Sequence, residues 1–221
     1  MINVSAQWRK RYDGACAGAL IIERVVNPLG NSELDRKKQQ IEAELRTRFK
    51  DRDGLRSHHV LVAYKDYYKR FKKTYHVQQQ VESIVFKGKS IPNVACLVEA
   101  MFMAELHHML LTAGHDLDLV EPPLTLNASK GDETFVKMNG EAQVLKEGDM
   151  FICDSVAPLS SVIYGPDART RIRAETTRVL FTVYGVPGIG EGTVREHLEE
   201  IAENVSLFSP EAAVTCMDLY R

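Results

Sequence analysis

Residues 94–111 are the most apolar stretch of the chain and constrain its fold more than any other feature. Proline is tolerated at the start of a helix, so we expect a helix from Pro92 to about Leu111. The stretch is apolar on nearly all sides, which predicts a helix buried at the centre of the protein. Ionisable residues inside it favour a core helix over a membrane span, since their charges are costly in a bilayer; they are Glu99, Glu105, His107 and His108.

The pattern of hydrophobic residues along the chain changes at Gly114. Before it, hydrophobic periodicity predicts strands over residues 17–26 and 58–64 and helices over residues 32–50, 65–76 and 77–88. After it, short strand-like runs alternate with turn sequences, and "NG" at 139–140 predicts a β-hairpin. A last helix is expected over residues 193–206, with Thr193 as its N-cap. This order indicates an α+β fold in one domain over residues 1–221, in which the central helix packs on an irregular antiparallel sheet and a C-terminal helix closes the core.

Charge and cysteine content leave the partner undecided but exclude some classes. The 28 Lys and Arg nearly balance the 30 Asp and Glu, so any attraction to nucleic acid must be local. The four cysteines lie far apart with no CxxC pair, which favours reduced thiols over a zinc ribbon or a disulfide framework. The first ten residues, "MINVSAQWRK", lack the apolar region of a secretory signal, so we expect a cytoplasmic protein without a membrane partner.

Two basic stretches are candidates for contact with RNA. In residues 65–76, cations alternate with aromatic residues at helical spacing, which fits either a nucleic-acid surface or an amphipathic helix with a buried aromatic stripe. The candidate RNA-binding cations there are Lys69, Arg70, Lys72 and Lys73. In "RTRIR", a strand would place Arg169, Arg171 and Arg173 on one face, either for phosphate contact or as a charged sheet edge.

Motifs for metal, nucleotide and nucleophile chemistry are absent from the sequence. Glu105 and His108 have the i, i+3 spacing of a Glu-x-x-His motif, but di-metal carboxylate sites need two such motifs and HExxH is absent. There is no GxSxG elbow and no P-loop, and "GVPGIGEG" at 185–192 does not have the order of a dinucleotide-binding loop. We therefore expect no metal and no cofactor.

Several sequence blocks, taken in order, carry a resemblance to a known family. These blocks are "FKGKSIPNVACLVEAMFMAEL" at 86–106, "GHDLD" at 114–118, "KGDETFVKMNGE" at 130–141, "KEGDMFICDS" at 146–155 and "ETTRVLF" at 175–181. Together they resemble the editing (B3/B4) domain of the phenylalanine–tRNA ligase β subunit, and most of all the stand-alone proteins built from that domain. The resemblance covers about residues 66–185 and implies the same α+β fold.

The resemblance also implies site residues. The histidine of the family's editing pocket falls on His115, while the position of the pocket's glutamate falls on Thr182, so that carboxylate is missing here. Polar residues near His115 are candidates for substrate binding, namely Asp116, Asp118 and Asn127.

Three functions stay open from the sequence. The first is a tRNA-binding module or a hydrolase that acts on mischarged aminoacyl-tRNA in trans, with no role in DNA binding expected. The second is a protein that binds an amino acid or a similar small molecule, without catalysis, in a pocket that corresponds to the family's editing pocket. The third is a structural protein that uses the charged helix over residues 32–50 as its interaction surface.

Overall fold

The computed structural model describes residues 2–221. Its N-terminal half contains β1 (Ile2–Val4), α1 (Ala6–Arg11), β2 (Cys16–Glu23), α2 (Ser32–Arg48), α3 (Arg52–Arg56), α4 (His59–Lys69), α5 (His76–Lys87) and α6 (Cys96–His108). Its C-terminal half contains β3 (Thr112–Asp116), η1 (Leu117–Leu119), β4 (Leu124–Ala128), β5 (Thr134–Val136), β6 (Ala142–Val144), β7 (Met150–Cys153), β8 (Pro158–Ser161), β9 (Gly165–Pro166), β10 (Arg178–Gly185), α7 (Glu191–Ser206) and β11 (Ala213–Tyr220). The mixture confirms the predicted α+β class.

Two larger sheets and a hairpin organise the chain. An antiparallel sheet has the order β11-β2-β10-β3, and a second sheet has the order β1-β4-β7-β8-β9 with a parallel β1–β4 pair. The hairpin β5–β6 stands at the predicted "NG" turn, where Gly140 has a φ of 84° that favours glycine. Strands far apart in the sequence thus become neighbours, because β11 at the C-terminus pairs with β2 near the N-terminus.

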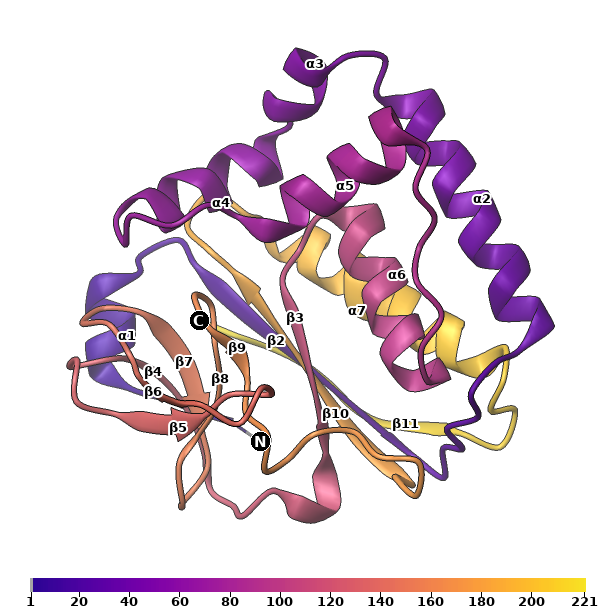
Figure 1. Cartoon of the computed structure of the whole chain (residues 1–221). Helices are drawn as coiled ribbons and strands as arrows, with labels where there is room; N and C mark the ends of the chain where they lie inside the picture. Colours follow the sequence, from indigo (N-terminus) through magenta and orange to yellow (C-terminus); the bar gives the residue numbers. More distant parts are fainter. Residues whose placement is uncertain (1) are drawn as a thin grey trace.

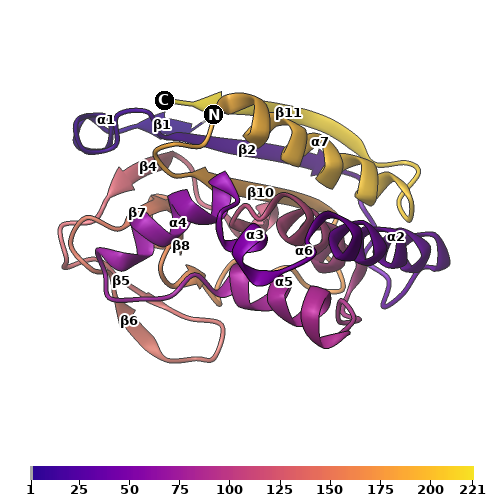
Figure 2. The same ribbon diagram turned by 90° about the horizontal axis from the view of Figure 1, so that it is seen from above.

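Helices α6 and α7 cover one face of the four-stranded sheet (Figure 1). Figure 2 shows α7 running along β2 and β11. Helix α7 packs closely on β2 at Gly18. A Cβ atom added there would lie 2.8 Å from the Val194 side chain and 2.9 Å from the Leu198 side chain of α7. The opposite face packs on the five-stranded sheet, as shown by the Tyr184 hydroxyl, which bonds to the backbone of β7 and β8. Strands β2, β10 and β3 are therefore buried on both faces over most of their length, under helices on one side and under a second sheet on the other, whereas β11 is partly exposed.

The predicted central helix is confirmed as α6. Its apolar side chains are buried, and Glu99 and Glu105 are buried with them. It begins at Cys96 rather than at Pro92, and the segment before it is extended. No helix among residues 2–221 has the length and apolar content needed to span a membrane.

Several predicted elements are wrong. Residues 59–64 belong to helix α4 and not to a strand, with His58 as the N-cap residue. The buried side chains of α4 recur at helical spacing; they are Val60, Leu61, Tyr64, Tyr67 and Tyr68. The basic helix over residues 65–76 ends at Lys69, and the chain turns through Lys72, which has a φ of 55°, before α5 begins.

The ends of the chain hold elements that the sequence patterns did not reveal. They are β1, α1 and β11. Helix α7 begins after Gly190, so Thr193 lies inside it and is not the N-cap. The strand expected over residues 169–173 is also absent, and this segment makes only an isolated bridge between Arg171 and His115. The arginines therefore do not share one strand face.

Candidate functional site

His115 lies in the middle of the molecule, on edge strand β3 of the four-stranded sheet, and its side chain is fully buried. Its Nδ1 atom lies 2.8 Å from the hydroxyl of Thr170. The Thr170 hydroxyl donates in turn to the carboxylate of Asp167, which places the hydrogen of the imidazole on Nδ1. The chain His115–Thr170–Asp167 thus fixes the ring and leaves the Nε2 lone pair without a donor among the described residues.

The environment keeps His115 neutral. Burial, assisted by the positive charge of Arg169, lowers the pKa of His115 to about 3. An imidazole with so low a pKa is a weak base at neutral pH, since general bases work best when their pKa lies near the working pH. The geometry therefore suits His115 as an orienting acceptor better than as a proton carrier.

Thr182 shares the inter-sheet face of the four-stranded sheet with His115. Thr182 of β10 pairs in register with Ala113 of β3, and His115 lies two residues after Ala113 on β3. The side chains of Thr182 and His115 therefore both point toward the five-stranded sheet. Thr182 is fully buried, and its hydroxyl has no hydrogen-bond partner among the described residues. The carboxylate nearest to His115 comes instead from Asp167, which the resemblance did not point to.

The other predicted pocket residues lie apart from the His115 imidazole. Asp116 points to the opposite face of β3, where its carboxylate accepts from Arg173, from the Thr176 hydroxyl and from the Asp118 backbone N–H. Asp118 is exposed and pairs with Arg178 at 2.9 Å. The Asn127 side chain accepts from the Ser5 hydroxyl at 2.7 Å. These contacts are structural.

The arginine segment, residues 169–173, is largely neutralised by carboxylates. Arg169 donates to Asp154 at 2.8 Å and to the Leu119 carbonyl at 3.0 Å. Arg173 binds Asp116 at 3.0 Å. Arg171 is exposed and donates to the carbonyl of Ala168. Two of the three guanidiniums are thus committed to carboxylates within the fold.

A second basic region surrounds the C-terminus of α4. A cavity of about 600 Å³ opens there, and we call it the basic groove; it is lined by Arg56, Lys65, Lys69, Lys72, Lys73, Thr74, Tyr75 and Gln78. No carboxylate belongs to this lining within residues 2–221. The lysine ion pairs of the described chain involve Lys38 and Lys137, so the four groove lysines keep their charge free.

Arg70 lies beside the basic groove rather than in it. It contributes to a neighbouring cavity of about 360 Å³ together with Arg11, Lys72 and Lys146. Its guanidinium also stacks 4.5 Å from the ring centroid of Tyr67. The aromatic residues of the stretch are themselves buried in the core, which leaves the cations as the surface feature.

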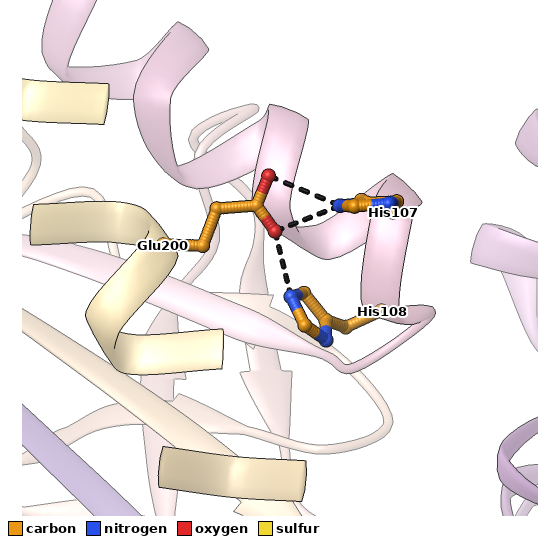
Figure 3. A group of neighbouring side chains, drawn as sticks. All are labelled: His107, His108 and Glu200. Carbon is orange, nitrogen blue, oxygen red and sulfur yellow. Dashed lines mark hydrogen bonds and ion pairs between the residues drawn. The ribbon is translucent and has the colours of Figure 1, made fainter. Parts of the chain in front are cut away.

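A third polar group joins the C-terminal end of α6 to the middle of α7 (Figure 3). His107 and His108 finish α6, and both imidazoles point at the carboxylate of Glu200 on α7, at 2.8 Å and 2.6 Å. Glu105, which has the i, i+3 spacing to His108 in the sequence, does not join this group, because its carboxylate accepts from the Thr112 backbone N–H. Nothing in the local sequence signals Glu200, because it meets the histidines only when α6 and α7 pack together.

Comparisons with known proteins agree on the fold. The model of the B3/4 domain family matches residues 63–200. The structure is similar to an N-terminal fragment of the phenylalanyl-tRNA synthetase β-subunit from Pyrococcus horikoshii, with a TM-score of 0.54 and 12% sequence identity. The similarity covers 100% of this chain and 54% of the synthetase fragment, so the chain spans about half the length of that relative. No curated protein matches the chain.

Proposed function

Because the chain belongs to the B3/4 domain family, and because a basic groove opens on its surface, we propose that it binds tRNA or aminoacyl-tRNA. The observation that carries the proposal is the basic groove itself. Five cationic side chains line it; Arg56 is paired with Glu82, whereas the four lysines have no carboxylate partner among the described residues, in a chain whose formal net charge is only −2. Such a local concentration of positive charge on a nearly neutral protein is the electrostatic footprint expected of a phosphate-backbone contact.

The groove has the chemistry of backbone contact rather than base recognition. Lysine ammonium groups act as point charges on phosphates, and binding gains from the counterions that the RNA releases. The stacking platforms that single-stranded binders use are buried here, because Tyr64, Tyr67 and Tyr68 fill the core. We therefore propose recognition of an RNA backbone in a folded RNA such as tRNA.

The test is a tRNA titration with matched charge reversals. Lys69→Glu/Lys73→Glu should weaken tRNA binding by roughly tenfold or more, because two phosphate contacts become repulsive. The control is Lys89→Glu/Lys130→Glu, which makes the same charge change at exposed lysines outside the groove. If wild-type protein binds no tRNA at low salt, or if both double variants lose the same affinity, the proposal fails.

Hydrolysis of a mischarged aminoacyl-tRNA in trans is the second candidate function. The unpaired Nε2 of His115 and the unpaired hydroxyl of Thr182, on one buried face, support a polar site that could hold a water molecule. Such a site could act by positioning a water, since the low pKa of His115 favours orientation over proton transfer. The Asp167–Thr170 pair would hold the ring in place.

A deacylation screen over several mischarged tRNAs tests this second candidate. Activity that falls in His115→Ala but persists in His59→Ala, an exposed histidine on α4, would support the buried pocket. Saturable thermal stabilisation by a free amino acid, without any deacylation, would instead favour small-molecule binding. Equal activity in wild type and His115→Ala would exclude a hydrolytic role for His115.

A further inference from the structure

We propose that His107, His108 and Glu200 form a zinc site that joins the end of α6 to α7 (Figure 3). Each residue offers one ligand atom, and the three ligand atoms all lie within 4.8 Å of one another. This site is independent of the basic groove and of tRNA binding, and it shares no residue with either the groove or the buried face around His115.

The donor set fits zinc. Two imidazole nitrogens and one carboxylate oxygen are ligands that Zn²⁺ accepts at about 2.0–2.2 Å, with a fourth position left to water in open sites. Ligands around a tetrahedral ion at that distance lie about 3.3 Å apart. The carboxylate of Glu200 now lies 2.8 Å from His107 Nδ1 and 2.6 Å from His108 Nε2, so side-chain rotations alone can open the group around an ion.

A second carboxylate, that of Glu44, lies close to the proposed ligand His107. The other ring nitrogen of His107, Nε2, lies 3.4 Å from the carboxylate of Glu44 on α2. Metal-binding histidines usually donate their second N–H to such an acceptor, which fixes the tautomer and makes the ligand nitrogen more basic. When an ion is bound, Glu44 can accept the hydrogen of His107 Nε2, which frees Nδ1, now hydrogen-bonded to Glu200, to coordinate the ion.

The exposure of the two histidines would let a bound ion exchange with solvent. The side chains of His107 and His108 are 28% and 19% exposed, so an ion can enter from solvent, whereas Glu200 is only 8% exposed. A positive charge also lies near the end of α6, because the Arg48 guanidinium donates to the His107 carbonyl at 3.4 Å.

The remaining residues around the group do not complete it. The ring of His197 stands edge-on to His108 at 5.4 Å between centroids, and its Nε2 is engaged with the Thr112 hydroxyl. Glu105 is held by the Thr112 backbone N–H. The proposed site thus has three protein ligands and one position open to solvent, and binding would tie α6 to α7.

The experiment is a titration of metal-free protein with Co²⁺ and Zn²⁺. We expect one equivalent of Co²⁺ to give the visible absorption of a low-coordinate site, and one equivalent of Zn²⁺ to remove it. Zn²⁺ should also raise the melting temperature, and a chelator should reverse the rise. No saturable binding near one equivalent would overturn the proposal.

Variants assign the ligands. Glu200→Gln and His108→Asn should abolish the Co²⁺ spectrum, and Glu44→Gln should weaken Zn²⁺ binding by roughly tenfold. His59→Asn, which removes an exposed histidine elsewhere, should bind as wild type does. Because Glu200 is mostly buried, the more exposed His107→Asn provides a second ligand deletion, with circular dichroism as the check on folding. Undiminished binding in folded His107→Asn would refute the assignment.

Discussion

The basic groove and the arginine segment carry similar positive charge in the sequence, yet the fold uses them in opposite ways. In the groove, Lys69, Lys72 and Lys73 face a cavity lined by no carboxylate among the described residues. In the segment, Arg169 and Arg173 are bound to the buried carboxylates of Asp154 and Asp116. A cation contributes to RNA affinity only if its charge is not already compensated, so we expect the first region to bind and the second to stabilise.

The largest expected effect is on stability, from Asp116→Ala. This change removes the acceptor of Arg173, of the Thr176 hydroxyl and of the Asp118 backbone N–H, and should cost about 2–3 kcal/mol in the free energy of unfolding. Urea denaturation measures the loss. The control Asp118→Asn breaks an exposed ion pair with Arg178 and should cost less than about 1 kcal/mol. If the two variants are equally stable, the segment is not held as we describe.

The second prediction concerns the pH dependence of stability through His115. Burial lowers the pKa of His115 from 6.5 to about 3. Below pH 6.5, His115 therefore binds a proton in the unfolded chain but not in the folded protein. This residue should therefore remove up to about 1.4 kcal/mol of stability per pH unit as the pH falls from 6.5 toward 3.

The measurement for His115 is a comparison of slopes. Urea unfolding of wild type and of His115→Asn between pH 6.5 and 4.5 should give a shallower acid loss in the variant, whatever its absolute stability. Parallel slopes in the two proteins would mean that His115 is protonated inside the fold, and would contradict a neutral ring beside Arg169.

The third prediction addresses the salt dependence of tRNA binding. Lys69→Gln/Lys73→Gln should lower the slope of log affinity against log salt by about 1.4–1.8, because two phosphate contacts no longer release counterions. Titrations at several salt concentrations provide the slopes. The matched change Lys89→Gln/Lys130→Gln, at exposed lysines outside the groove, should leave the slope as it is. A slope that falls equally in both double variants would assign binding to net charge rather than to the groove.

The smallest effect is expected at Arg171. It is the exposed member of the arginine segment, and it donates to the Ala168 carbonyl rather than to a carboxylate. Arg171→Gln should change tRNA affinity by less than about twofold, since a single cation outside the groove adds little. A loss as large as that of the groove variant would place RNA on the arginine segment and reverse the comparison.

Much of the fold could be predicted because periodicity reports burial directly. The apolar sides of residues 94–111 predicted the central helix, and "NG" predicted the β5–β6 hairpin. The same rule misassigned residues 58–64, because a short apolar run fits a strand and a buried helix equally well. It also could not foresee that residues 169–173 leave the sheet, since this depends on buried carboxylates supplied by distant segments.

The candidate sites divide in a similar way. The sequence by itself determined the α+β class, the resemblance that placed the chain in its family, and the presence of a cation-rich stretch around Lys69 and Lys73. Only the tertiary structure decided which charges stay free, that Asp167 and not a residue near position 182 supplies the carboxylate closest to His115, and that Glu200 meets His107 and His108. The physical reason is that local sequence sets how each segment buries its apolar side, whereas packing brings together charges that lie far apart along the chain.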